Sequence, residues 1–129
     1  MAAITHYAGK HQIYRWECAN YLNTEIDPTG ATAISFTIKS ADTDEDATIV
    51  LEKTLADGID IVERTNGVVT EGGTPGIEVE LDAEGDDTDE MAEGDYVFDL
   101  QVVTSSGRNI VIEKDIFTID YAVKRATPA

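Results

Sequence analysis

The chain has 129 residues, of which 42% are hydrophobic and 27% charged. This composition is that of one folded globular domain and excludes a disordered acidic segment. Only 9 Lys and Arg stand against 26 Asp and Glu, for a formal net charge of -17, so we expect neither nucleic acid nor an anionic membrane as a partner, because both need a clustered positive field.

The cysteine content and the N-terminus bear on where the chain is made. The single cysteine, Cys18, cannot form an intrachain disulfide, so burial of a core must stabilise the fold. The first residues lack the basic and apolar regions of a signal peptide, and no stretch approaches the roughly 18 apolar residues of a membrane span. These features predict synthesis in the cytoplasm, without a signal for export or membrane insertion.

Alternation of apolar and polar residues with period two runs through most of the chain and predicts β-strands. In chain order, the predicted strands with their inward residues are 12–18 (Tyr14, Trp16, Cys18), 32–39 (Ile34, Phe36, Ile38), 48–53 (Ile49, Leu51), 58–63 (Ile59, Ile61), 76–81 (Ile77, Val79, Leu81), 95–104 (Tyr96, Phe98, Leu100, Val102) and 109–120 (Ile110, Ile112, Phe117, Ile119).

Local signals add detail to this pattern. The turn residues Ser105-Ser106-Gly107 join the last two strands and predict an antiparallel hairpin. In the final strand the apolar positions change phase near Lys114, which predicts a β-bulge. One helical turn is predicted over residues 88–91, with Thr88 as its cap and Met91 filling the end of the core.

About seven strands with regular turn spacing and no crossover helices predict an all-β fold, an immunoglobulin-like antiparallel β-sandwich of two sheets. We expect the sandwich to span residues 9–121, between an N-terminal arm over 1–8 and a C-terminal arm over 122–129. Chain ends are commonly poorly ordered. The functional alternative is that an arm becomes ordered against a neighbouring subunit.

Four residues are candidates for contacts with a partner. Tyr7 and Tyr121 fall outside or at the edge of the alternating runs, and aromatic side chains often anchor interfaces. Lys124 and Arg125 place positive charge beyond the last strand of an otherwise acidic chain. We therefore predict weak interaction sites at these four positions.

Two acidic clusters could in principle bind calcium. Residues 42–46 open like an EF-hand loop, but Ala47 replaces the required Gly and Lys53 stands where the bidentate Glu belongs, which rejects that motif. The second cluster, residues 84–90, could form a looser site at one end of the sandwich. The competing interpretation, which we favour, is that both are solvated loops that promote solubility and protect strand edges.

No set of residues indicates catalysis. Neither His6 nor His11 has a Cys or His partner at metal-ligand spacing, so both are predicted to be surface histidines. Ser105-Ser106-Gly107 is no nucleophile elbow, and Cys18 lies on a predicted inward face, where an inert thiol is expected. We therefore predict no catalytic residue, metal or cofactor, and a protein that is not an enzyme.

Several turn and strand motifs follow one another in a distinctive order between residues 26 and 119. They are IDPTGAT (26–32) before ISFTIK (34–39), LEKT (51–54), GIDI (58–61), IEVEL (77–81), MAEG (91–94) before YVFDLQV (96–102), and IFTI (116–119). This order resembles a group of small bacteriophage β-sandwich domains, including the N-terminal domain of baseplate upper proteins and related modules of tail-associated proteins. Residues 66–76 and the strand around Trp16 depart from that pattern.

The resemblance implies a structural docking module of a phage particle, near the tail or baseplate. A chain without a further receptor-binding domain also suits a capsid decoration protein. Partners would then be other virion proteins and a second copy of the chain, and the protein would reside in the virion after synthesis in the host cytoplasm. The alternative from another class is a calcium-stabilised adhesion or carbohydrate-binding β-sandwich.

Overall fold

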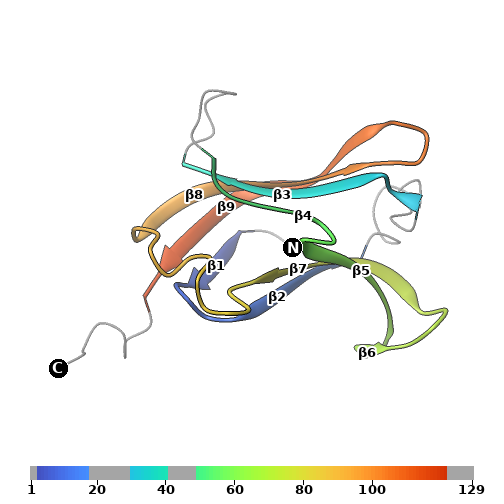
Figure 1. The fold of residues 1–129 in the computed structure, drawn as a ribbon, viewed down its shortest axis with the longest axis horizontal. Coiled ribbons are helices and arrows are strands. Elements are labelled where there is room, and N and C mark those ends of the chain that lie inside the picture. The colour runs from blue at the N-terminus through green and yellow to red at the C-terminus, as the bar shows by residue number, and fades with distance from the viewer. Residues whose placement is uncertain (1–2, 18–29, 41–48, 122–129) are drawn as a thin grey trace.

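The computed structural model describes residues 3–17, 30–40 and 49–121, which form nine β-strands and no α-helix. The strands are β1 (Ile4–Tyr7), β2 (Gln12–Glu17), β3 (Ala33–Lys39), β4 (Ile49–Leu55), β5 (Gly58–Thr65), β6 (Val68–Val69), β7 (Thr74–Leu81), β8 (Gly94–Val103) and β9 (Asn109–Asp120) (Figure 1). The predicted all-β class is confirmed. The seven predicted strands are all present, and β1 and β6 were not anticipated.

The strands form one mixed sheet in the order β1-β9-β8-β3-β4-β5-β7-β2, with β6 paired to β5. Two pairs are parallel: β1 with β9, and β4 with β5 over only two residue pairs. The prediction of a wholly antiparallel arrangement is therefore wrong. Strands β1 and β9 are far apart in the chain and are not joined by a hairpin, so no tight turn forces them to be antiparallel.

The sheet curls until β3, β8 and β9 lie opposite β2 and β7, and the core fills the space between them (Figure 1). Aromatic rings meet across this space: the Trp16 ring lies 6.0 Å from that of Phe36 and 6.2 Å from that of Phe98, measured between centroids. The Trp16 indole N–H donates to Glu113 at 2.6 Å. This hydrogen bond satisfies the one polar atom of a ring that is otherwise buried in apolar contacts.

Most of the predicted inward residues are buried. The apolar positions of β3, β7 and β8 that were predicted to face inward are buried, or partly buried at Tyr96, and Phe36 and Phe98 are fully buried. On the outward side of these strands, Thr37 and Glu78 are buried as well. Ile49 is an exception, since 53% of it is exposed. Because Ile38 pairs with Leu51 whereas Lys39 pairs with Ile49, Val50 is an extra residue in β4. This bulge reverses the facing of Ile49, so its predicted inward orientation is wrong.

The predicted hairpin and bulge at the C-terminal end are confirmed. Strands β8 and β9 are antiparallel on either side of the turn, and the register shifts where Leu100 pairs with Glu113 but Gln101 pairs with Val111. The extra residue is Ile112, two positions before the predicted phase change. At residues 88–91 the Met91 amide donates to the Thr88 carbonyl at 3.0 Å, which makes a turn where a helical turn was predicted.

The N-terminal segment corrects the expected domain boundaries. Residues 4–7 form β1, paired in register with Phe117 to Asp120 of β9, and Ile4, His6 and Ala8 are buried. An arm over residues 1–8 is therefore wrong for the part that the structure describes, because alternate apolar positions of this segment complete the core. The predicted C-terminal arm over 122–129 and Cys18 lie outside the described residues. Within these ranges, no helix could span a bilayer.

Candidate functional site

A cluster of polar side chains, buried except for one half-buried tyrosine, lies at one end of the molecule, where β1, β2 and the end of β7 meet. We call His6, Tyr14, Asp82 and Thr88 the His6 cluster. His6 is 1% exposed and has a partner on each ring nitrogen: Tyr14 OH lies 2.7 Å from Nδ1, and Asp82 Oδ2 lies 2.7 Å from Nε2. The His6 ring also stacks on Phe117, with centroids 5.9 Å apart. Strand β1 is thus attached to three other segments through one side chain.

Asp82 is the acceptor at the centre of the cluster. Its Oδ1 accepts the backbone amides of Asp87 and Thr88 at 2.7 and 2.8 Å, and its Oδ2 accepts the Thr88 hydroxyl at 2.6 Å in addition to His6. Thr88 Oγ1 in turn accepts the Gly9 amide at 2.9 Å. A buried carboxylate is tolerated when its oxygens are fully hydrogen-bonded. These bonds join the loop after β7 to the turn between β1 and β2.

The cluster alters the acidity of two of its members. Burial alone would raise the pKa of Asp82, but hydrogen bonds from Thr88, His6 and the Asp87 amide outweigh it and hold the pKa below its usual value. Burial, together with the nearby charge of Asp82, raises the pKa of Tyr14 to about 12. At neutral pH the cluster therefore contains a carboxylate and an un-ionised phenol.

The hydrogen-bonded chain Tyr14–His6–Asp82 resembles the nucleophile, base and carboxylate of a catalytic triad. The surroundings of these three side chains nevertheless favour a structural role. A raised pKa makes the phenol a weaker source of the nucleophilic oxyanion, and His6 is enclosed by protein. The prediction that His6 is a surface histidine is wrong, because its ring completes the core beside Phe117. His11 matches its prediction: its side chain is 53% exposed and lies 2.7 Å from Glu80.

A second polar cluster lies on β2, β5 and β7. Glu78, 7% exposed, accepts hydrogen bonds from Arg64 at 2.5 Å and from Arg15 at 2.7 Å. Arg15 also donates to the carbonyls of Val62 and Thr74, each at 2.9 Å. Hydrogen bonds from Arg64, then Arg15, lower the pKa of Glu78 despite its burial. These bonds fix β2 and β5 to β7 and involve two of the nine basic residues of the chain.

The guanidinium of Arg15 lies directly over Gly76. A Cβ atom at this glycine would lie 2.5 Å from Arg15 Cζ. A side chain at position 76 would therefore displace the guanidinium and disturb its hydrogen bonds to Glu78, Val62 and Thr74. In the β2–β7 ladder Gly76 itself pairs with Glu17.

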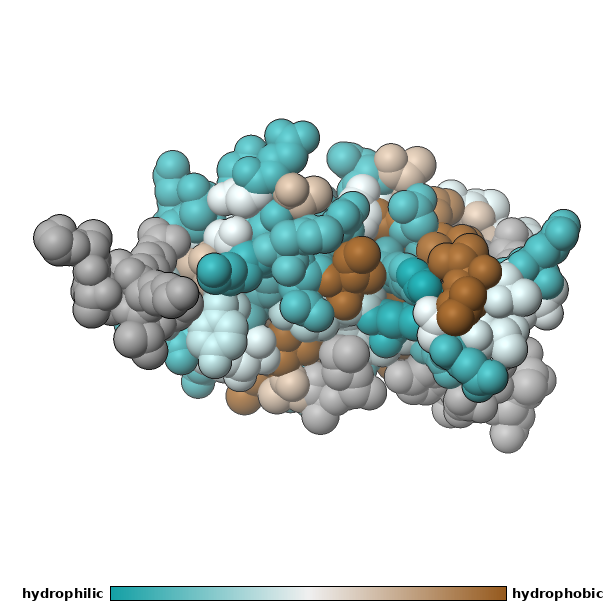
Figure 2. Space-filling model, turned by 90° about the horizontal axis from the view of Figure 1, so that it is seen from below, coloured by the Kyte–Doolittle hydropathy of each residue, from teal (hydrophilic) through white to brown (hydrophobic). Residues whose placement is uncertain are grey.

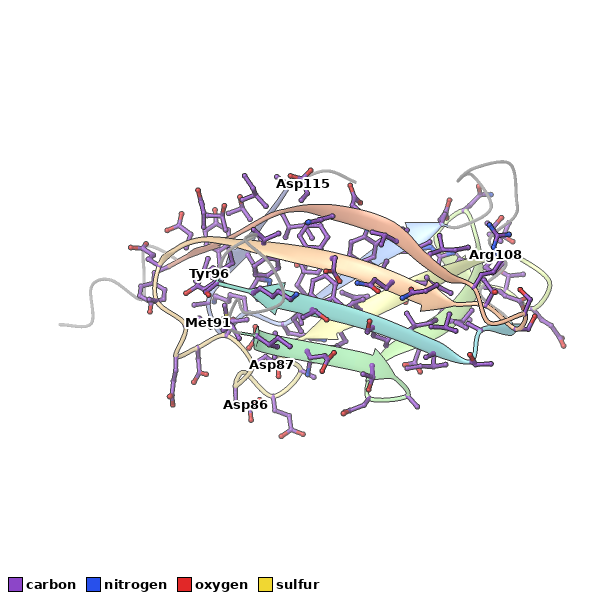
Figure 3. All side chains as sticks on the ribbon, turned by 90° about the horizontal axis from the view of Figure 1, so that it is seen from above. Asp86, Asp87, Met91, Tyr96, Arg108 and Asp115 are labelled. Atoms are coloured by element: carbon purple, nitrogen blue, oxygen red, sulfur yellow. The ribbon has the colours of Figure 1, made fainter. Side chains whose placement is uncertain are left out.

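The acidic end loop does not bring its carboxylates together. Asp87 accepts from Lys53 Nζ at 2.9 Å and from the Asp82 amide at 2.6 Å, whereas Asp86 is exposed and points away from the strands (Figure 3). Among the described residues, no group of three or more His, Cys, Asp or Glu side chains could hold a metal ion. The other predicted cluster, residues 42–46, lies outside the described ranges.

The predicted contact residues have different environments. Tyr7 is 49% exposed at the end of β1. Tyr121 packs partly against the core, and its hydroxyl donates to the Met91 carbonyl at 3.0 Å. Lys124 and Arg125 lie outside the described residues. The structure therefore places Tyr7 at the surface and gives Tyr121 a role in holding the end of β9 to the 91–94 turn.

Large apolar side chains are exposed at several strand positions. Val68 and Val69 on β6 are 65% and 64% exposed, and apolar surface is visible at the end of the molecule where β6 lies (Figure 2). Exposed surface of this kind marks contact sites when it is contiguous. The full set of exposed large hydrophobic residues is Tyr7, Ile13, Ile49, Val50, Val68, Val69, Val111 and Ile116.

Nothing in the sequence indicated that the four residues of the His6 cluster meet, although Tyr14 was predicted to face inward and Thr88 to cap a helical turn. His6 and Asp82 are 76 positions apart, and none of the four members belongs to a recognisable motif. The alternation of Ile4, His6 and Ala8 was the only pattern that could have indicated a buried strand at the N-terminus. It is too short to separate from chance.

Comparisons with known proteins give little similarity. No family model matches the chain, and no curated protein matches it. Among solved structures, murine CRIg is similar over 95% of this chain and 93% of that chain, with 8% sequence identity and a TM-score of 0.35.

Proposed function

We propose that this chain is a non-enzymatic structural protein of a bacteriophage particle, acting as a docking module of the tail and baseplate or as a capsid decoration protein. The proposal joins the resemblance of residues 26–119 to phage β-sandwich domains with the distribution of polar and apolar groups in the structure. Its partners would be other virion proteins and further copies of itself, and the virion would be its location.

We further infer that the curled sheet acts as an immunoglobulin-like sandwich of two sheets. One sheet would contain β1, β9, β8, β3 and β4, and the other β5, β7 and β2. Two features support this division: β4 and β5 share only two residue pairs, and the rings of Trp16 and Phe36 pack across the interior. Such a sandwich presents broad strand faces and end loops to partners.

The functional proposal rests on one contrast in the structure. Apolar side chains on several strands are exposed to solvent, whereas buried polar side chains are hydrogen-bonded within the protein. Val68, Val69 and Val111 are each more than half exposed. In contrast, every buried side-chain nitrogen or oxygen of the described residues has a hydrogen-bond partner. A surface of this kind suits docking through apolar contact, which symmetric repetition in a particle would strengthen.

The genes that adjoin this one provide the first test. Adjacency to a major capsid gene supports decoration, adjacency to baseplate genes supports a tail role, and a locus without phage structural genes contradicts the proposal. The products of adjoining structural genes should then form a complex with the purified chain, detected by light scattering after size exclusion.

Two variants would examine the contacts that such a complex uses. Removal of residues 122–129, or Lys124→Glu with Arg125→Glu, should weaken the complex while the thermal midpoint stays unchanged. A matched control is Lys10→Glu, which changes one exposed basic residue near the other end of the chain. A complex that tolerates the truncation as well as it tolerates the control would show that the C-terminal segment is not part of the docking contact.

A further inference from the structure

Strand register places one row of residues across the outward side of four strands. Ile116 on β9 pairs with Val97 on β8, Val97 pairs with Lys39 on β3, and Lys39 pairs with Ile49 on β4. Ile116 and Ile49 are 45% and 53% exposed, and the neighbours of Ile116 and Val97 along each strand, Phe117 and Phe98, are buried. Three of the four residues in this row are apolar and the fourth is Lys39; we call the row, which lies on the side that faces away from the core, the apolar stripe. We call this side of β9, β8, β3 and β4 the outer face.

The next row of paired residues across the same four strands has a charged residue at each end. Lys114 pairs with Asp99, Asp99 with Thr37, and Thr37 with Glu52. The Thr37 hydroxyl donates to Glu52 at 3.4 Å, and Gln101 donates to Asp99 at 3.2 Å. A lysine thus stands on β9 at one side of the outer face, and a glutamate on β4 at the other.

We propose that the outer face binds the outer face of a second copy of this chain, related by a two-fold axis that runs parallel to the strands between β8 and β3. This rests on the proposed docking function and names its partner. The rotation reverses the order of the strands and keeps the rows aligned. Ile116 of one copy then meets Ile49 of the other, and Lys114 meets Glu52.

The charges of the outer face are what select a second copy as the occupant. The whole chain carries 26 acidic and 9 basic residues, which opposes self-association in general. The two-fold axis, however, sets Lys114 of each copy against Glu52 of the other, so opposite charges meet at two symmetric places, whereas Lys39 meets Val97 and Asp99 meets Thr37. A self-complementary patch is the requirement of an isologous interface. The contacts of Ile116 with Ile49 would supply apolar area to this interface, and the Lys114–Glu52 pairs would supply its charged contacts.

The geometry also agrees with how sheets pack. Face-to-face sheets lie about 10 Å apart with strand directions within about 30° of one another. Side chains of valine and isoleucine size fill such a gap, as they do between the sheets of a protein core. The twist of the sheets leaves the best alignment near the axis, where Val97 and Lys39 of one copy meet Lys39 and Val97 of the other.

Sedimentation equilibrium of the full chain over a wide concentration range tests the proposal. We expect a monomer–dimer equilibrium, and Ile116→Asp should raise the dimer Kd about tenfold or more, because it places a charge in the apolar contact between Ile116 and Ile49 twice per dimer. The control Ile13→Asp changes an isoleucine of similar exposure, 43%, on β2. It should leave the Kd unchanged.

A charge exchange identifies the pairing itself. Lys114→Glu and Glu52→Lys should each raise the homodimer Kd about tenfold, because each sets like charges together at two symmetric places. An equimolar mixture of the two variants should restore dimerisation, since a mixed dimer again has opposite charges at both places. Recovery in the mixture cannot result from a folding defect.

Three outcomes would overturn the proposal that a second copy binds the outer face. They are a chain that stays monomeric, a dimer Kd that Ile116→Asp leaves unchanged, and a mixture of the two charge variants that does not dimerise. Binding of the product of an adjoining gene through Ile116, by a chain that is monomeric alone, would assign the outer face to that partner instead. Each of these results leaves the virion proposal standing, because that proposal is decided by the gene neighbourhood and by complex formation.

Discussion

At the His6 cluster four polar side chains are buried or half-buried, and their hydrogen bonds join β1, β2, the turn between them and the loop after β7. On the outer face the arrangement is reversed, with Ile116 and Ile49 about half exposed beside charged residues. The first region uses polarity to hold the chain together. The second exposes apolar surface that nothing within the described residues covers. Buried polar groups thus stabilise the fold at the first region, and the exposed isoleucines are the basis of the proposed contact at the second.

The strongest test of this contrast removes residues 1–8. We expect the unfolding free energy to fall by about 4 kcal/mol or more, because the truncation opens the core at Ile4 and leaves Asp82 without His6. Urea denaturation followed by circular dichroism measures the loss. The control Tyr7→Ala alters an exposed residue of the same strand and should change the free energy by less than about 0.5 kcal/mol. A truncated chain as stable as the full one would mean that β1 contributes no core.

A smaller but more local effect is expected from Asp82→Ala. The substitution leaves His6, Thr88 and the Asp87 amide without their acceptor and should cost about 3 kcal/mol, also measured with urea. Asp86→Ala is the matched control, since Asp86 is exposed in the same loop. Equal effects of the two substitutions would contradict the assignment of Asp82 as the central acceptor.

The same carboxylate predicts a dependence on acid. The pKa of Asp82 is lower in the folded chain than in the unfolded chain. The ionised carboxylate therefore contributes its full share of the unfolding free energy above about pH 4, and this share is lost as the pH falls through the pKa of the folded chain. The difference in stability between the wild type and Asp82→Asn should therefore narrow below about pH 4. A constant difference would argue against a charged Asp82.

The smallest predicted effect concerns Tyr14 in alkali. Its pKa of about 12 lies above the usual value of 10.0, so the folded chain keeps a proton that the unfolded chain releases, and stability falls as the pH rises from 10 towards 12. Tyr14→Phe should flatten this part of the stability profile. In an absorbance titration of phenolate, the variant should also lack the ionisation near pH 12 that Tyr14 contributes to the wild type. Loss of absorbance change in another part of the titration would contradict the raised pKa of Tyr14.

The sequence was informative wherever alternation was long. Ile34, Phe36 and Ile38 on β3 and the hairpin between β8 and β9 could be predicted because side-chain period and turn chemistry are local properties. The bulge in β9 could be predicted because it shifts the apolar phase within one strand. The bulge at Val50 could not, since only three apolar residues mark that part of β4.

The sites depend on contacts that local patterns do not record. His6 meets Asp82 across 76 positions, and the row from Ile116 to Ile49 exists only once four strands are in register. Four residues are too few for alternation to establish β1 as a strand. The polar residue at the centre of β1 even argued against burial, because a lone histidine near a chain end is more often exposed.

The parallel pairing of β1 with β9 decides how the protein would respond to mechanical tension. The chain enters β1 at Ile4, opposite Phe117, and leaves β9 after Asp120, opposite Tyr7. A pull on the two ends therefore slides the two strands past each other along their length. Their hydrogen bonds share that load and must break together, whereas a hairpin pulled at its open end loses its bonds one at a time. The His6 side chain adds a lateral anchor to the strand that would slide.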